Sequence, residues 1–491
     1  MTSLAEHIRL LRGRLSPVSS VLVLSLLLSW LALQGRLVNR DGVLYLSLAR
    51  LIVEDGYAEA AKFGDLTFLP LLIAGLSYVL PLSYETIAKL LDALFMAGTC
   101  ALMVDMVRRR APEAVWFAVL VVLAMPAYNQ FRSDILREYG FWFFSTLGFW
   151  FAMRLMERPT WREALGVQGA LMLAALFRLE ALVLLVALSF WQAVAAPSGE
   201  KLRRAGMIVM LPLAAGLVML LLIAAGIVSP PNRLMYYLAA ADPLHKIEVF
   251  SAAAVRLSDE VLLNKYSREE AGFILFFGLL ALIPVKFLKM TGILLIPFVY
   301  QCRKAFWPTL ITWPPLAWSF GFYSLVLAGF VTHNMFLVGR YVSFLDLLAV
   351  PFIAVGLAGF CKSHPRWKIA LLTLIVLTMF ANVVSKSPRP THILKAGEWL
   401  RNNVDVQTRV GFENSRIAYY AGRKIPWVDR ADVPELAKSL ADGQLDLVVV
   451  EVSLKDPASK ELFSNKRLVE LQRFTGPKEE VVIFSAPANQ R

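Results

Sequence analysis

Two aspartates are the first residues whose position suggests chemistry. Asp41 follows an apolar run within the segment Asn39-Arg40-Asp41-Gly42, and Asp134 lies in a second polar segment, residues 129–139, between two apolar runs. A carboxylate at the edge of a polar cavity can accept a proton from an attacking hydroxyl group. Because aspartate is also a favoured helix N-cap, Asp41 fits a catalytic base, a cap, or both.

Further charged residues stand at the ends of apolar runs. Arg137 and Glu138 follow Asp134, and on a helix the three side chains would share one face. Arg178 and Glu180 separate the next two apolar runs. Charges near lipid are costly and usually face a bundle interior or a wet cavity, which indicates a substrate site. A local ion pair at a helix end is the alternative for both groups.

A third polar segment offers groups for binding an anion. It contains His333, and Arg340 and Tyr341 follow it at the start of an apolar run. A guanidinium group is always charged and binds phosphate through two parallel hydrogen bonds, whereas anchoring at the membrane interface is the alternative role. Lysines that could contact the same anion are Lys62, Lys89, Lys286 and Lys289.

The elements that must position these residues are membrane helices. Hydrophobic residues make up 57% of the 491 residues and charged residues only 18%, and the apolar residues form repeated runs of about twenty, enough to cross a bilayer. This composition excludes an ordinary soluble enzyme and a disordered chain. The net charge of +13 lies mostly in short clusters between apolar runs, so it indicates membrane orientation and no nucleic-acid partner.

The basic clusters predict the topology if all of them are cytoplasmic. They are Arg9/Arg12/Arg14, Arg108–Arg110, Arg154/Arg158/Arg162, Lys201/Arg203/Arg204, Arg303/Lys304 and Lys362/Arg366/Lys368. Eleven spans result, with ten to thirteen allowed: 18–33, 84–107, 112–128, 139–153, 164–177, 181–196, 205–228, part of 271–300, 308–331, 341–360 and 369–384. Residues 66–82 are predicted to lie at the outer interface, as is the remainder of 271–300. The first outer loop, residues 35–83, carries an amphipathic helix from Val43 onward.

The composition divides the chain into a membrane module, residues 1–387, and a small α/β domain outside the membrane, residues 388–491. Strands are predicted at 409–412, 445–452 and 481–484, and helices at 393–402, 433–440 and 459–473. We find no phosphate-binding loop, no zinc motif and no dinucleotide fingerprint, and the three cysteines lack metal-ligand spacing. No cofactor is therefore predicted; a divalent metal is compatible with the sequence but not indicated by it.

Taken together, these segments resemble the membrane-embedded glycosyltransferases of the GT-C type, above all bacterial protein O-mannosyltransferases and lipid A aminoarabinose transferases. The similarity rests on Arg40-Asp41-Gly42-Val43-Leu44-Tyr45, on the polar segment around Asp134, on Arg340-Tyr341, and on residues 414–422 of the outer domain. It implies transfer of a sugar from a polyprenyl-phosphate donor on the periplasmic face of a bacterial inner membrane. It also implies Asp41 and Asp134 as catalytic carboxylates, with Lys62 and Arg340 near the donor phosphate.

Two other functions fit a polytopic membrane protein. A lipid-linked glycan flippase would have internal repeats and charges at mid-membrane depth, and we detect no such repeats. A ligase or polymerase of O-antigen type would have a large outer loop between late spans, and residues 229–270 are only moderate in length. The sequence leaves open the donor sugar and whether the acceptor is a lipid, a glycan or a protein.

Overall fold

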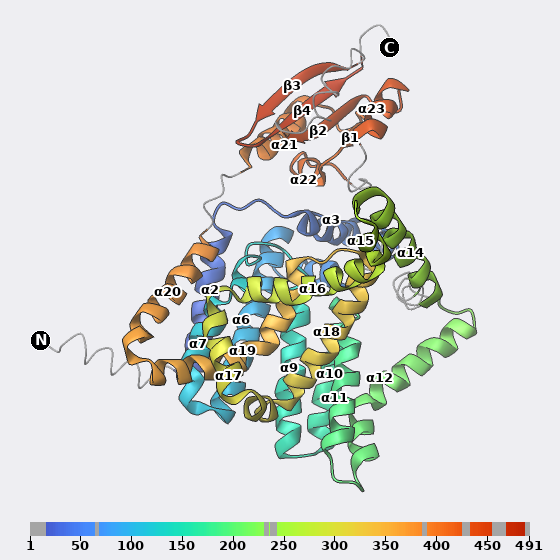
Figure 1. Ribbon diagram of the computed structural model, residues 1–491. Helices are drawn as coiled ribbons and strands as arrows, with labels where there is room; N and C mark the ends of the chain where they lie inside the picture. The colour runs from blue at the N-terminus through green and yellow to red at the C-terminus, as the bar shows by residue number, and fades with distance from the viewer. Residues whose placement is uncertain are drawn as a thin grey trace, which may run out of the picture. The chain divides into compact units, whose positions relative to one another are not determined.

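The computed structural model describes residues 16–63, 68–229, 235, 243–384, 390–424, 433–453 and 468–486. It is mainly helical, with one four-stranded sheet near the C-terminus (Figure 1). Its contacts define two compact units: one comprises Met1–Leu33, Leu90–Ser133 and Arg137–Ser385, and the other comprises Gln34–Lys89, Asp134–Leu136 and Lys386–Arg491. The predicted fold class, a multi-span helical membrane protein with a small C-terminal α/β part, is confirmed. The cluster Arg9/Arg12/Arg14 lies outside the described residues.

The first unit is a helical bundle, to which α6 contributes its residues from Leu90 onward. Its helices are α2 (Pro17–Leu33), α6 (Tyr84–Arg110), α7 (Val115–Ala124), α8 (Pro126–Asn129), α9 (Glu138–Glu157), α10 (Trp161–Phe177), α11 (Ala181–Ala195), α12 (Lys201–Ala224), α14 (Pro243–Arg256), α15 (Lys265–Glu269), α16 (Ala271–Thr291), α17 (Leu295–Thr312), α18 (Pro314–Asn334), α19 (Gly339–Ser363) and α20 (Pro365–Val383). Among the described residues, seven helical segments are long and apolar enough to cross a membrane, and three apolar helices are shorter. The total of eleven spans stays a prediction.

One predicted span is wrong. The run 308–331 is not one helix, because the chain turns at Trp313 between α17 and α18, where Pro314 and Pro315 start a new helix. The long run 271–300, for which two pieces were predicted, divides at Gly292, whose φ of +58° suits glycine, and Pro284 lies inside α16. Hydropathy alone does not locate either position because the apolar composition continues across both.

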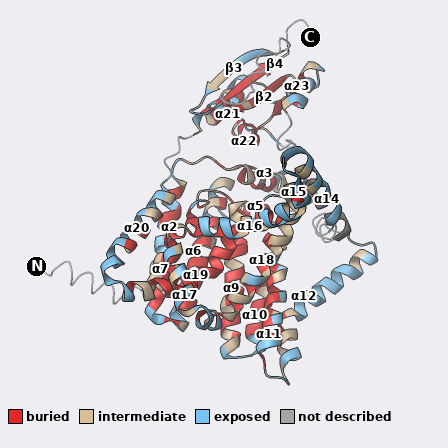
Figure 2. Ribbon diagram, viewed as in Figure 1, coloured by how far each residue is buried: buried red, intermediate tan, exposed pale blue. Residues whose placement is uncertain are grey.

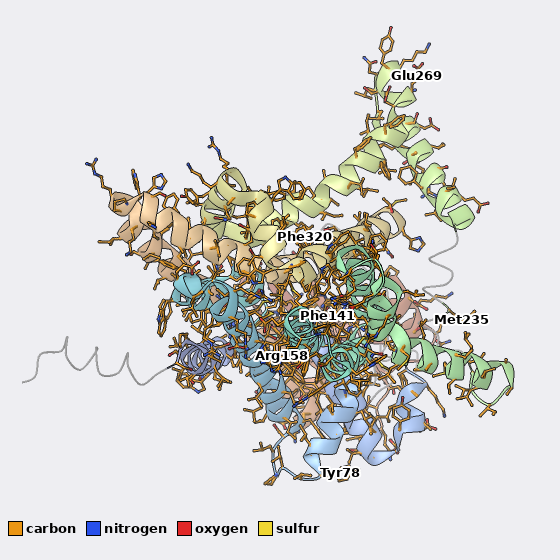
Figure 3. The ribbon with its side chains drawn as sticks, turned by 90° about the horizontal axis from the view of Figure 1, so that it is seen from below. Tyr78, Phe141, Arg158, Met235, Glu269 and Phe320 are labelled. Atoms are coloured by element: carbon orange, nitrogen blue, oxygen red, sulfur yellow. The ribbon has the colours of Figure 1, made fainter. Side chains whose placement is uncertain are left out.

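Burial differs strongly among the helices of this unit. In the most apolar 18-residue stretch of α19, 78% is buried, whereas in that of α12 only 11% is buried. Figure 2 shows the difference by colour. In the view from below, Phe141 of α9 lies near the middle of the bundle (Figure 3). Since α12 is highly apolar, its exposed side chains suit contact with lipid, and α9 and α19 form the protein interior.

Both ends of α9 carry charged residues. At its C-terminal end, Arg110 pairs with Glu157 at 3.3 Å and Arg154 pairs with Glu163 at 2.8 Å. Glu138 begins the helix, and its 20 residues place the two ends about 30 Å apart, the thickness of a bilayer core. The predicted substrate residue Glu138 is therefore well separated from the ion pairs at the other end.

The second unit contains the first outer loop and the C-terminal domain. Its elements are α3 (Arg40–Glu54), α4 (Tyr57–Ala61), α5 (Phe68–Ser77), α21 (Thr391–Asn403), β1 (Val410–Phe412), α22 (Ser415–Tyr420), α23 (Val433–Ala441), β2 (Leu447–Ser453), β3 (Val469–Thr475) and β4 (Glu479–Ser485). The sheet order is β1-β2-β4-β3, with only β1 and β2 parallel. One face of the sheet packs on α21 and α22 through Leu400, Ile417, Val449 and Ile483.

One predicted helix in this domain is wrong. Of residues 459–473, positions 459–467 lie outside the described residues, and Val469–Thr475 is strand β3. It pairs with β4 along its length, with an irregularity between Glu470 and Gln472. That irregularity disturbs the alternation of side chains, so the sequence lacks a clear strand pattern and the pairing with β4 decides the conformation.

Candidate functional site

A buried network of charges forms where α9, α11 and α19 begin. Arg178 donates from Nη1 to Glu138 Oε1 at 2.9 Å and from Nη2 to Glu180 Oε1 at 2.7 Å. The side chains of Arg178 and Glu138 are only 6% and 4% exposed. A buried guanidinium between two carboxylates is compensated, so Arg178 holds the carboxylates in place and has little capacity left for a substrate.

Arg340 and Tyr341 lie against the same network. Arg340 Nε is 3.7 Å from Glu138 Oε1, and the Arg340 side chain is 30% exposed. The Arg178 guanidinium stacks over the Tyr341 ring at 4.7 Å, and Arg340 lies 5.5 Å from that ring. The Arg340 side chain is therefore more accessible than that of Arg178.

Guanidinium groups of three arginines gather at this network. Arg137, Arg178 and Arg340 face two carboxylates, Glu138 and Glu180, and buried Nη1 of Arg137 has no hydrogen-bond partner among the described residues. Glu180 lies in the loop between α10 and α11; burial would raise its pKa, but the Arg178 guanidinium lowers the pKa to about 2. Both features suit binding of an anion more than proton transfer by Glu180.

Local sequence explains how these groups are placed. Helix α10 ends where Arg178 takes an extended conformation, and α11 begins at Ala181. Helix α18 ends at Met335, a non-glycine residue with φ of +56°, and α19 begins at Gly339. His333 lies in the last turn of α18. The short connections present Arg178, Glu180 and Arg340 at helix ends.

Asp41 lies in the first turn of α3, in the second unit. Asn39, and not Asp41, is the N-cap residue, so the predicted capping role of Asp41 is wrong. A carboxylate in the first helical turn is still favoured by the helix dipole. Glycine is required at position 42, since a Cβ there would lie 2.6 Å from Asn39 Oδ1 and 2.8 Å from Val38 Cγ1.

The segment of Asp134 is held beside the segment of Asp41. Asn39 Oδ1 accepts from the Ile135 backbone N at 2.9 Å, and Asn39 Nδ2 donates to Ile135 O at 3.3 Å. Asp134 precedes α9, so the prediction that Asp134, Arg137 and Glu138 share a helical face is wrong. Asn39, which makes this link, was not among the predicted site residues.

Lys62 is placed differently from the other candidates. It follows α4, its side chain is 64% exposed, and its Nζ pairs with Glu59 at 2.5 Å. An exposed lysine with a neighbouring carboxylate is typical of a solvated helix end. The predicted contact of Lys62 with a donor phosphate thus has no support from this structure, because the side chain is exposed and its ammonium group is already paired.

The second unit also contains a group that could hold a metal ion. His392, Glu451 and Glu479 offer ligand atoms that all lie within 4.8 Å of one another. However, Glu451 already accepts from Asn414 and from His392, and Arg416 lies 3.6 Å away. These bonds link α21, α22 and β2, which favours a structural role for the group.

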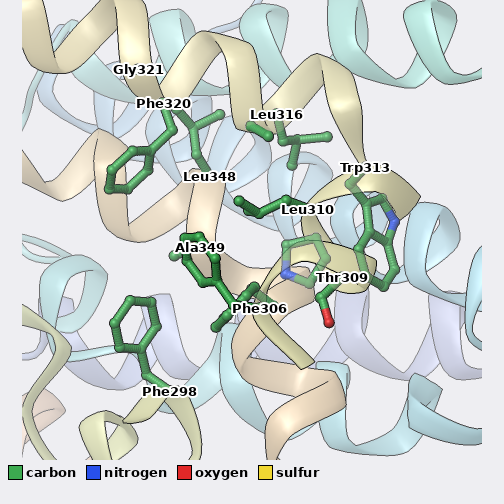
Figure 4. Close-up of a pocket in the computed structure, with 13 residues that line it drawn as sticks. Phe298, Phe306, Thr309, Leu310, Trp313, Leu316, Phe320, Gly321, Leu348 and Ala349 are labelled. Atoms are coloured by element: carbon green, nitrogen blue, oxygen red, sulfur yellow. The ribbon is translucent and has the colours of Figure 1, made fainter. Parts of the chain in front are cut away.

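An apolar cavity lies inside the first unit, between α17, α18 and α19. Its volume is about 200 Å³, and Figure 4 shows the rings of Phe298, Phe306 and Phe320 around it together with Trp313. Leu348 and Ala349 form its wall on α19, about 12 Å along the helix from Tyr341. Its composition suits a hydrocarbon chain.

No protein-family model and no curated protein matches this chain. Several solved structures are similar to it, among them two of one protein. ArnT from Cupriavidus metallidurans bound to undecaprenyl phosphate has a TM-score of 0.55 at 13% identity, covering 95% of this chain and 97% of ArnT. The same protein in the apo state has a TM-score of 0.54 at 13% identity, covering 96% and 98%. The expected likeness to the lipid A aminoarabinose transferase group is thereby confirmed at the level of fold: over almost its whole length, this chain has a fold similar to that of ArnT.

Proposed function

We propose that the protein is a membrane glycosyltransferase that takes a sugar from a polyprenyl-phosphate donor and passes it to an acceptor on the periplasmic face. The observation that carries this proposal is the fold shared along 95% of the chain with ArnT, a protein solved with undecaprenyl phosphate bound. The buried Nη1 of Arg137, which has no hydrogen-bond partner among the described residues, and the partly exposed guanidinium of Arg340 support it, because a polyprenyl phosphate is an anion.

The proposed reaction is a single displacement. The acceptor oxygen forms a bond to the anomeric carbon, the bond from that carbon to the phosphate oxygen breaks, and polyprenyl phosphate leaves with the electron pair. The acceptor proton passes to the Asp41 carboxylate. Arg340, aided by Arg137, stabilises the charge that grows on the leaving phosphate. Attack opposite the leaving group inverts the anomeric centre.

Asp134 has a supporting role in this proposal. Its segment is fixed to the N-cap of α3 through Asn39 and Ile135, so it belongs to the same local structure as Asp41. In this proposal the second carboxylate orients the acceptor hydroxyl. No metal is required in this scheme, because guanidinium groups supply the positive charge.

The first test is turnover of a panel of undecaprenyl-phosphate sugars by purified protein in lipid nanodiscs. We expect release of undecaprenyl phosphate by the wild type and a loss of about a hundredfold or more in Asp41→Asn, which removes the general base but keeps the side-chain size. Asp55→Asn is the matched control, because Asp55 lies at the other end of α3. Equal turnover of Asp41→Asn and the control would reject Asp41 as the base. Movement of intact donor across the bilayer of sealed proteoliposomes, without cleavage, would indicate a flippase.

A further inference from the structure

A second polar cavity lies within the second unit, where the C-terminal domain meets the first outer loop. Its volume is about 490 Å³. Its charged and aromatic lining residues are Arg50, Glu85, Arg401, Tyr419, Tyr420 and Arg423. They come from α3, the first turn of α6, the last turn of α21, and α22 with the residues after it. The cavity is thus built from four segments that are distant in the sequence.

The cavity has a positive lining. Three arginines face it with one carboxylate, Glu85, and that carboxylate already accepts from Lys89 Nζ at 2.5 Å. Arg423 is fixed in place by donating to the backbone carbonyls of residues 404, 405, 406 and 408. Carbonyl groups orient this guanidinium without cancelling its charge. An anion is therefore the complementary ligand.

Two tyrosines give the cavity an aromatic side. The rings of Tyr419 and Tyr420 lie 5.2 Å apart in an edge-to-face arrangement. Burial, with a further contribution from Glu85, raises the pKa of Tyr419, so its hydroxyl group stays protonated and can donate. Aromatic rings that carry hydroxyl groups pack against the apolar face of a sugar and also bond to its hydroxyls. This combination suits a sugar with a charged substituent better than an inorganic ion.

The cavity is connected to the candidate catalytic loop. The Tyr420 hydroxyl accepts from the Val38 backbone N at 3.0 Å, three residues before Asp41. On the same side of the domain, Arg40 lies 3.9 Å from Glu413, and Lys424 pairs with Glu54 at 2.6 Å. Helix α22 therefore forms a wall of the cavity and also contacts the start of α3.

We propose that this cavity binds an anionic sugar unit of the acceptor, one that carries a phosphate or a carboxylate. The inference rests on the proposed glycosyl transfer and names the acceptor's chemical class. Arg50 and Arg401 contact the anionic substituent, Arg423 adds positive charge, and Tyr419 and Tyr420 contact the ring. Binding here brings the rest of the acceptor to the loop that carries Asp41.

The test measures binding and needs no turnover. Saturation-transfer NMR on the full chain in phosphatidylcholine nanodiscs compares glucose 6-phosphate with glucose, two probes that differ only in the anion. We expect binding of the phosphate alone, weakened about tenfold by Arg50→Gln and by Arg401→Gln. Arg203→Gln, at an exposed arginine of α12, is the matched control and should bind as the wild type does. Arg401 is exposed on α21, so its variant keeps the test valid if Arg50→Gln fails to fold.

Several results would overturn the proposal. These are equal binding of glucose, no binding of the phosphate, or unchanged binding in both arginine variants. Loss of binding in phosphatidylglycerol nanodiscs would assign the site to lipid headgroups instead of the acceptor. Release of undecaprenyl phosphate from the donor is followed separately, so failure of the anion site is distinguishable from failure of the glycosyltransferase function.

Discussion

At the scale of single residues, Arg178 and Arg340 differ in how far they are buried. The Arg178 side chain is 6% exposed and bonds to Glu138 and Glu180, whereas the Arg340 side chain is 30% exposed and lies 3.7 Å from Glu138. Removing Arg178 leaves two buried carboxylates without their main cation. We expect Arg178→Met to lose about 3–5 kcal/mol of stability, seen as a lower melting temperature in detergent.

Arg340→Met is the matched variant for this prediction. Its side chain is partly solvated, so we expect a smaller loss of stability but a large fall in the rate of donor cleavage. Equal melting temperatures for Arg178→Met and the wild type would contradict the structural role of Arg178. A full rate in Arg340→Met would contradict its contact with the leaving phosphate.

Much of the charged network was predictable at this scale. Burying a charged side chain beside apolar runs costs free energy, so such side chains are expected to pair with one another. The sequence correctly marked Arg137, Glu138, Arg178, Glu180, Arg340 and Tyr341 as polar groups at helix ends. It did not indicate which arginine is neutralised. That depends on distances between helices far apart in the chain, such as the 2.9 Å between Arg178 and Glu138.

At the scale of elements, the start of α3 is fixed by close packing around Gly42. A methyl group there would lie 2.6 Å from Asn39 Oδ1, the atom that accepts from Ile135 N, so Gly42→Ala must displace the link between the two aspartate segments. We expect a tenfold to hundredfold fall in kcat, at about unchanged donor affinity, because small displacements of catalytic groups are costly.

Gly75→Ala provides the control for this substitution. Gly75 lies in α5 of the same unit, and a Cβ there meets no atom within 4 Å. Alanine should be tolerated or even favoured at that helical position. Equal kcat for the two variants would show that the Asn39–Ile135 link does not position the reacting groups.

The boundaries of helices were predictable where the sequence changes from apolar to charged, and they were not predictable within a continuous apolar run. The ends of α6, α9, α11 and α19 lie beside charged residues, and the predicted ranges agree closely with the structure. The turn at Trp313 and the break at Gly292 lie inside continuous apolar sequence. Strand β3 was taken for a helix because its conformation depends on pairing with β4, a contact that short-range patterns do not contain.

At the scale of the whole molecule, the basic clusters predict which side of the membrane each loop occupies. Arg158, labelled in Figure 3, follows α9 beside the Arg154–Glu163 pair, and it should face the cytoplasm. Lys478, in the exposed turn between β3 and β4, should face the periplasm. The proposed function requires this orientation, because a periplasmic acceptor must reach the loop of Asp41.

Cysteine labelling in intact cells tests the orientation directly. The three native cysteines are replaced by alanine, and Arg158→Cys or Lys478→Cys is then introduced one at a time. A membrane-impermeant maleimide should label Lys478→Cys in cells with a permeable outer membrane. It should label Arg158→Cys only after the inner membrane is opened. The reverse pattern would place the C-terminal domain in the cytoplasm, where a periplasmic acceptor cannot reach it, and the proposed transfer reaction would then fail even if the donor were cleaved in vitro.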